Sequence, residues 1–274
     1  NVLSECPQAF ADALQRWARI NRRHLTEMDG ERLPSSHHES LLYQTLIGTW
    51  PERVVAATEP DYADRIVAYM QKAAREGKEQ SSWFSPDMAY EGALERFIRG
   101  ILEAGANNPF PDDLTRFVTQ LIPFGRWNSL VQSLLQITVP GMPDIYQGIE
   151  LEALSLVDPD NRRPVDYAKR RELLDRLLKH PAPADRWETA WAARDEGTLK
   201  LHLLVTILTW RREDPALFQR GSYLPLTVSG PRADHLCAFA RIFEDRAMIV
   251  LAPRLLHTAC QGDTEQLNAT LWTG

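Results

Sequence analysis

Helical spacing of the bulky apolar residues constrains the first half of the chain more than any other feature. Phe10, Leu14 and Trp17 recur about one helical turn apart, with arginines between them, as in an amphipathic helix over residues 10–25. The same periodicity returns in later stretches, at residues 36–47, 62–73, 86–102, 112–122 and 127–136. These patterns predict a mainly helical region over residues 1–136.

Two of the predicted helices carry start signals. Ser36 and Glu39 form a capping-box pair, and residues 85–87 (Ser-Pro-Asp) supply a cap, a first-turn proline and an early acid. His37 and His38 precede Glu39 but lack the HExxH spacing of zinc proteases. We interpret this group as a helix cap with exposed imidazoles and assign it no catalytic role.

The pattern changes after residue 136. Residues 137–139 (Ile-Thr-Val) are β-branched and end at a Pro-Gly-Met-Pro segment, which predicts one buried strand before a constrained loop. Helical patterns return at residues 166–179 and 199–212. Short β-like runs then follow at residues 223–228, 235–243, 248–251 and 269–272.

These elements predict a mainly α, α+β chain in three parts. Residues 1–136 form a helical region, residues 137–220 carry the strand, a polar loop and helices, and residues 221–274 form a small antiparallel β domain. Nothing in residues 1–136 indicates a repeat or a low-complexity tract.

Composition excludes several classes of partner. The chain has 274 residues, with 31 basic against 37 acidic side chains and a net charge of −6. No basic cluster lies among aromatic residues, so we expect neither nucleic acid nor an anionic membrane as a partner. No apolar run reaches the roughly 18 residues that would cross a bilayer.

Cysteine usage and the first residues favour a reducing compartment. Cys6, Cys237 and Cys260 are three in number and lack CxxC spacing, so we predict no disulfide framework and no metal site. Residues 1–25 lack the charged start and apolar core of a signal peptide. We expect a cytoplasmic protein without a cofactor, and its start at Asn1 suggests a longer parent chain.

Polar side chains gather in residues 137–164. They are Asp144, Tyr146, Gln147, Glu150, Asp158, Asp160, Asn161, Arg162 and Arg163. Carboxylates, amides and guanidinium groups can satisfy the vicinal hydroxyls of a sugar, and an aromatic ring can cover its apolar face. The same residue types are also common turn formers, and composition alone leaves both interpretations open.

A resemblance favours the sugar site. Residues 141–150 (GMPDIYQGIE) resemble the motif at the eighth strand of α-amylase superfamily barrels, and residues 158–164 (DPDNRRP) resemble the loop after it. Together they are most similar to the maltooligosyltrehalose synthase family. Residues 41–51, 69–91 and 211–226 support that similarity, although Ser81-Ser82-Trp83 stands where Thr-Ser-Trp is usual.

The resemblance implies an intramolecular transglucosylase. Such an enzyme converts the reducing-end α-1,4 linkage of a maltooligosaccharide to the α,α-1,1 linkage of trehalose. The catalytic carboxylates of the superfamily lie in motifs that should precede residue 1, and none matches within this chain. We therefore expect the end of a (β/α)8 barrel, inactive alone, whose partners are a maltooligosaccharide and the upstream remainder of the barrel.

The resemblance also implies binding residues. Asp158, Asn161 and Arg162 are predicted to bind glucosyl hydroxyls near the reacting bond. A second predicted set shares that role and consists of Asp144, Tyr146, Gln147 and Glu150. Lys78 and Trp83 are candidates for an acceptor-sugar pocket, against the alternative that Trp83 is core and Lys78 solvated. The other tryptophans are predicted to pack internally.

Two other functions remain open from the sequence. One is a non-catalytic helical protein that uses its polar loop to bind carbohydrate or to act as a scaffold. The other is a related α-glucan hydrolase, which would release glucose instead of forming trehalose. An upstream reading frame with the barrel motifs would favour an enzyme over a scaffold.

Overall fold

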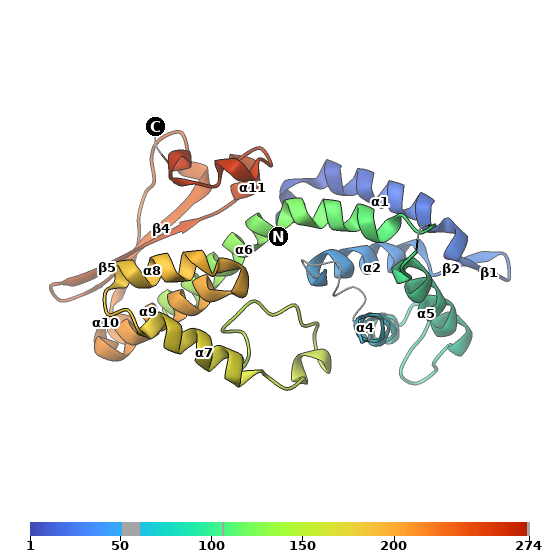
Figure 1. Cartoon of the computed structure of the whole chain (residues 1–274), viewed down its shortest axis with the longest axis horizontal. Helices are drawn as coiled ribbons and strands as arrows, with labels where there is room; N and C mark the ends of the chain where they lie inside the picture. The colour runs from blue at the N-terminus through green and yellow to red at the C-terminus, as the bar shows by residue number, and fades with distance from the viewer. Residues whose placement is uncertain (51–60, 106, 273–274) are drawn as a thin grey trace. The chain divides into compact units, whose positions relative to one another are not determined.

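The computed structural model describes residues 1–50, 61–105 and 107–272 (Figure 1). The chain divides into two compact units. The helical unit comprises Cys6–Leu121 and Leu154–Arg163, and the mixed unit comprises Asn1–Glu5, Ile122–Ala153 and Pro164–Gly274.

Helices dominate the helical unit. They are α1 (Pro7–Asn21), α2 (Ser36–Thr49), α4 (Tyr62–Gly77), α5 (Met88–Leu102) and the first part of α6 (Phe110–Thr138). A short antiparallel hairpin joins α1 to α2, with β1 (Thr26–Met28) paired to β2 (Glu31–Leu33). The helical periodicity of the sequence thus predicted the helices of this unit, whereas the β1–β2 hairpin was not predicted.

Aromatic packing forms the centre of the helical unit. The Trp17 ring lies 5.4 Å from Tyr43 and 5.8 Å from Phe110, and all three side chains are fully buried. The Trp17 indole N–H donates to Asp113 at 2.7 Å, so its polar atom is satisfied inside the core. Asn21 donates to the Tyr43 hydroxyl at 2.9 Å.

Both predicted helix caps are displaced by one or two residues. Ser35, not Ser36, caps α2 and accepts from the backbone N–H of His38. Asp87, not Ser85, caps α5 and accepts from the backbone N–H groups of Ala89 and Tyr90. The cap is the residue whose oxygen reaches the free N–H groups of the first turn, and several candidates stood side by side in the sequence.

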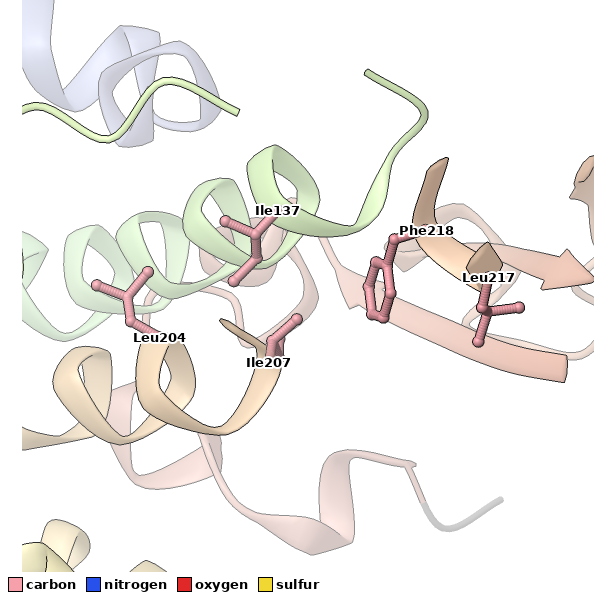
Figure 2. Close-up of a cluster of buried hydrophobic side chains, with 5 residues drawn as sticks. All are labelled: Ile137, Leu204, Ile207, Leu217 and Phe218. Carbon is pink, nitrogen blue, oxygen red and sulfur yellow. The ribbon is translucent and has the colours of Figure 1, made fainter. Parts of the chain in front are cut away.

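The prediction of a strand at residues 137–139 is wrong. Helix α6 runs without interruption from Phe110 to Thr138, across the position where two separate helices were predicted and through Pro123. Ile137 is fully buried and belongs to a hydrophobic cluster with Leu204, Ile207, Leu217 and Phe218 (Figure 2). Packing of this helical face outweighs the β-branched character of a three-residue run.

The mixed unit combines helices with a three-stranded sheet. Besides the second part of α6, its helices are α7 (Tyr167–Leu178), α8 (Pro183–Ala192), α9 (Thr198–Glu213), α10 (Pro215–Arg220) and α11 (Leu256–Ala259). The antiparallel sheet has the order β3-β4-β5, formed by Ser222–Pro225, Leu236–Phe243 and Arg246–Pro253. The helices predicted at 166–179 and 199–212 are confirmed, whereas α8, α10 and α11 were not predicted.

The β-like run at residues 269–272 is the second error of element type. Ala269–Trp272 forms a 3₁₀ helix. The mainly α, α+β class with a small C-terminal sheet is confirmed. Among the described helices, none combines the length and the apolar character that crossing a bilayer requires.

Candidate functional site

Asp160 organises the polar loop of the helical unit, Leu154–Arg163. Arg65 of α4 contacts both Asp160 carboxylate oxygens, Nε at 2.8 Å and Nη2 at 3.0 Å. The backbone N–H of Leu156 donates to the same carboxylate at 2.7 Å. Burial opposes ionisation of Asp160, but the hydrogen bonds from Arg65 and Leu156 outweigh it and lower the pKa of the carboxyl. Asp160 is therefore an ionised anchor inside the loop.

The three residues first predicted to bind glucose lie around this anchor. Asp158 and Arg162 form an ion pair with each other, and the Arg162 side chain is 72% exposed. The Asn161 side-chain oxygen is buried and has no hydrogen-bond partner among the residues that the structure describes. Lys72 of α4 donates to the Asp158 backbone carbonyl at 2.6 Å. The backbone of the loop is thus held by hydrogen bonds, and its polar side chains can still form hydrogen bonds with a ligand.

Lys78 and Trp83 lie on the segment between α4 and α5. Lys78 is the exposed left-handed residue that ends α4, with φ of 58°. Trp83 is 54% exposed, and the Arg75 guanidinium lies 4.9 Å from its ring. The alternative to a sugar pocket placed Trp83 in the core and Lys78 in solvent. It is wrong for Trp83 and right for Lys78.

An ion pair between the half-buried Arg75 and the buried Glu91 fixes the base of this segment. Arg75 contacts both carboxylate oxygens of Glu91, at 2.8 and 2.6 Å, and Ser81 donates to Glu91 at 2.6 Å. The hydrogen bond from Arg75 lowers the pKa of the Glu91 carboxyl, so this buried acid stays ionised. One helix, α4, therefore contacts both candidate regions of the helical unit: Arg65 and Lys72 contact the Leu154–Arg163 loop, and Arg75 contacts Trp83 and Glu91.

The second predicted set lies in the mixed unit. Glu150 pairs with Arg170 at 2.8 Å, and Arg170 also donates to the Gly148 carbonyl at 2.5 Å. Gln147 accepts from the Tyr167 hydroxyl at 3.2 Å. Glu150 and Gln147 thus take part in contacts within the unit.

The side chains of Asp144 and Tyr146 are exposed, as is that of Gln147, whereas Glu150 is half-buried. The Asp144 backbone carbonyl accepts from the Gln136 side chain, which ties the start of the loop to α6. Glycine is required at residue 148, where φ is 90° and a Cβ would approach Val165 to 3.0 Å.

Two predictions about rings need correction. His38 is 3% exposed, not a solvent-exposed imidazole, and its Nδ1 lies 2.7 Å from the Tyr90 hydroxyl.

Trp17 and Trp50 are buried as predicted. Four other tryptophans are between 40% and 51% exposed, namely Trp187, Trp191, Trp210 and Trp272. Three of these four, with Trp127, line a cavity of about 430 Å³ in the mixed unit.

The sequence did not single out Arg65, Lys72 or the anchoring role of Asp160. Arg65 and Asp160 are 95 residues apart, and no sequence motif at that separation indicates that they pair.

Among the described residues, no group of three or more His, Cys, Asp or Glu side chains could hold a metal ion.

Known proteins resemble this chain in sequence. No family model matches it. Two Mycobacterium tuberculosis proteins, from strains CDC 1551 / Oshkosh and ATCC 25618 / H37Rv, carry the name of a maltooligosyl trehalose synthase. Each is 36% identical over 208 residues, which are 76% of this chain and 24% of the relative. The chain therefore spans about a quarter of the length of these curated relatives.

Solved structures agree with the sequence match. A crystal structure of a maltooligosyl trehalose synthase superposes with a TM-score of 0.76 at 27% identity, covering 92% of this chain and 31% of that one. The maltooligosyltrehalose synthase from Arthrobacter ramosus gives a TM-score of 0.70 at 34% identity, covering 95% and 30%. This chain is therefore homologous to a part of the maltooligosyl trehalose synthases.

Proposed function

We propose that this chain is the C-terminal part of an isomerase of trehalose biosynthesis. The full-length enzyme would convert the reducing-end α-1,4 linkage of a maltooligosaccharide to an α,α-1,1 linkage. The chain would contribute sugar-binding residues, and a catalytic barrel upstream of residue 1 would contribute the reacting carboxylates. The cytoplasm, where trehalose would be made from glucans, is its proposed location. The match over 76% of the chain to proteins of that name carries this proposal.

The electrostatics of the polar loops support a binding role over an acid–base role. A general acid in a glycosidase needs a raised pKa, so that it holds a proton near neutral pH. The carboxyls of Asp160 and Glu150 instead have lowered pKa values, because hydrogen bonds to each carboxylate outweigh the effect of burial. Both acids would remain ionised and hold their loops in place.

The proposed reaction makes specific demands on these loops. A retaining carboxylate pair would form a glycosyl-enzyme intermediate, and the released glucose would re-attack through its anomeric hydroxyl. The site must therefore hold free glucose while it turns and must exclude water. Hydrogen bonds from Asp158, Asn161 and Arg162 to glucosyl hydroxyls are the contribution that we propose for this chain, and Lys78 and Trp83 would line the acceptor side.

Product analysis tests this function. Maltopentaose is incubated with the 274-residue chain and, separately, with the full-length protein of the same gene, and the products are separated by chromatography. We expect trehalose-terminated product from the full-length protein only. Free glucose as the main product would indicate an α-glucan hydrolase, and trehalose-terminated product from the chain alone would contradict the proposed division of roles.

One observation favours a second candidate, a non-catalytic carbohydrate-binding protein. The indole rings of Trp187 and Trp191 lie 5.9 Å apart at 25° to each other, on the cavity of the mixed unit. Half-exposed parallel rings can cover the apolar faces of sugars. Two results together would favour this candidate. Maltopentaose would quench the tryptophan fluorescence of the 274-residue chain but not that of its Trp187→Ala variant. The full-length protein would also form no product from maltopentaose.

A further inference from the structure

The Leu154–Arg163 loop has little regular structure of its own. Its regular element is the 3₁₀ turn η3 (Asp160–Arg162), in which the Arg162 N–H donates to the Pro159 carbonyl at 3.0 Å. A loop of this kind has many accessible conformations, and fixing one of them costs about 1–2 kcal/mol of entropy per residue. Contacts from outside the loop must therefore select its conformation.

Helix α4 supplies those contacts through two cations. Arg65 makes three hydrogen bonds to the loop: two to the Asp160 carboxylate and one to the Leu154 carbonyl at 3.0 Å. The side chains of Arg65 and Asp160 are only 14% and 9% exposed, so water competes weakly for this bidentate pair. Lys72 adds its bond to the Asp158 carbonyl.

The ends of the loop and its centre are thereby fixed to one rigid helix. Leu154 opens the loop and Asp160 lies beside its last residues, so Arg65 spans both. The Asp160 carboxylate also accepts from the Leu156 N–H, so the Arg65–Asp160 pair holds the backbone at Leu156 as well. Asp158, Asn161 and Arg162 all lie within the segment that these bonds hold.

We infer that Arg65 is a positioning residue for glucan binding, which fixes the Leu154–Arg163 loop so that Asp158, Asn161 and Arg162 meet glucosyl hydroxyls in a preformed arrangement. This inference rests on the proposed function. Asp160 is the partner through which Arg65 acts and does not itself contact sugar. If only a fraction of molecules holds the loop correctly, the apparent affinity falls by that fraction.

Two measurements on the same variants test the inference. The first is hydrogen exchange of the Leu154–Arg163 amides in the 274-residue chain, which needs no substrate. The second is steady-state kinetics of the full-length protein with maltopentaose. The variants are Arg65→Ala and Arg65→Lys, and the control is Arg99→Ala, because Arg99 pairs with Asp64 and Glu95 in the same unit and has no bond to the loop.

In Arg65→Ala we expect amide exchange to accelerate by about tenfold or more within the loop and to stay unchanged in α1 and α2. We expect KM to rise about tenfold while kcat changes by less than about threefold, because the loop conformation that binds is less populated. Arg65→Lys retains one charge but not the bidentate geometry, so it should recover part of both effects. Arg99→Ala should show neither.

Each other outcome has a defined meaning. Unchanged exchange in the loop would overturn the inference whatever the kinetics show. Accelerated exchange with unchanged KM would also overturn it, because the loop would then not limit binding. If kcat/KM is unchanged in Arg162→Ala as well, Arg162 makes no productive contact with sugar and the proposed function of the loop fails with it. Should Arg65→Ala not fold, Asp160→Asn, which removes the charge but keeps the shape, is measured in the same way.

Discussion

Hydrogen bonds from arginines anchor four acids of this chain. Asp160, Glu150, Glu91 and Asp113 each accept from an arginine, and each has a lowered pKa. The sequence showed which residue types gather in the polar segment but not which of them are already paired. The pairing of Asp160 depends on a partner 95 residues away, and such a contact arises only from the fold.

His38 should make the chain less stable as the pH falls. Burial lowers the pKa of His38, and the charge of His37 lowers it further, although Glu79 opposes both. As the pH falls through about 6.5, the unfolded chain therefore binds a proton more readily than the folded chain does. The free energy of unfolding by urea should drop more between pH 7.5 and 5.5 in the wild type than in His38→Gln.

His24 and His202 also have lowered pKa values, and burial is the main cause in both. They remain in the wild type and in the variant, so their contribution cancels in the comparison. An equal pH dependence of the two proteins would show that His38 titrates alike in the folded and unfolded chains.

Two tryptophans of the helical unit should respond differently to truncation. Trp17 is fully buried and donates to Asp113, so Trp17→Ala should cost about 3–5 kcal/mol of unfolding free energy. Trp83 is 54% exposed and its ring lies 4.9 Å from the Arg75 guanidinium, so Trp83→Ala should cost less than about 1 kcal/mol. Urea unfolding of both variants measures the difference. Similar losses would place Trp83 among the core residues after all.

At the scale of elements, periodicity predicted helix over most residues of the long helices, and two short β-like runs were given the wrong element type. The helices at 166–179 and 199–212 were predictable because several apolar turns repeat along each of them. The runs at 137–139 and 269–272 are too short for a period to be distinguished. Ile137 continues the buried face of α6, and its packing against Leu204 and Ile207 could not be read from three β-branched residues.

Two arginines cap the end of α6. Arg211 donates to the Ile137 carbonyl at 2.8 Å, and Arg241 donates to the Thr138 carbonyl at 3.0 Å. The last carbonyls of a helix have no partners within the helix and carry partial negative charge, so cations stabilise them. These contacts explain why α6 can extend up to the start of the Pro-Gly segment.

Replacing Arg241 should therefore destabilise the mixed unit. Arg241 is 1% exposed and also donates to the carbonyls of Phe218 and Gly221. Arg241→Met keeps the bulk but leaves three acceptors without this donor, so we expect a loss of about 2–4 kcal/mol in urea unfolding. The control is Arg246→Met, whose partly exposed pair with Asp214 should contribute less than about 1 kcal/mol. Equal losses would argue against the capping role.

At the scale of the whole molecule, the chain matches about a quarter of its curated relatives and nearly a third of the solved structures. The motifs at residues 141–150 and 158–164 were enough to predict that relationship. They did not reveal that the two sets of predicted residues belong to different compact units. Residues 141–150 lie in the mixed unit, whereas the Leu154–Arg163 loop belongs to the helical unit. Which residues share a unit depends on long-range contacts such as that between Arg65 and Asp160.

Steady-state kinetics of Arg162→Ala in the full-length protein test the central claim that the Leu154–Arg163 loop binds the glucan. Arg162 is 72% exposed, and its removal leaves the Arg65–Asp160 anchor intact. One charge-assisted contact is worth about 1.5–3 kcal/mol, so kcat/KM for maltopentaose should fall roughly tenfold to a hundredfold. Arg99→Ala should retain the wild-type value. An unchanged kcat/KM in a folded Arg162→Ala enzyme would contradict the account.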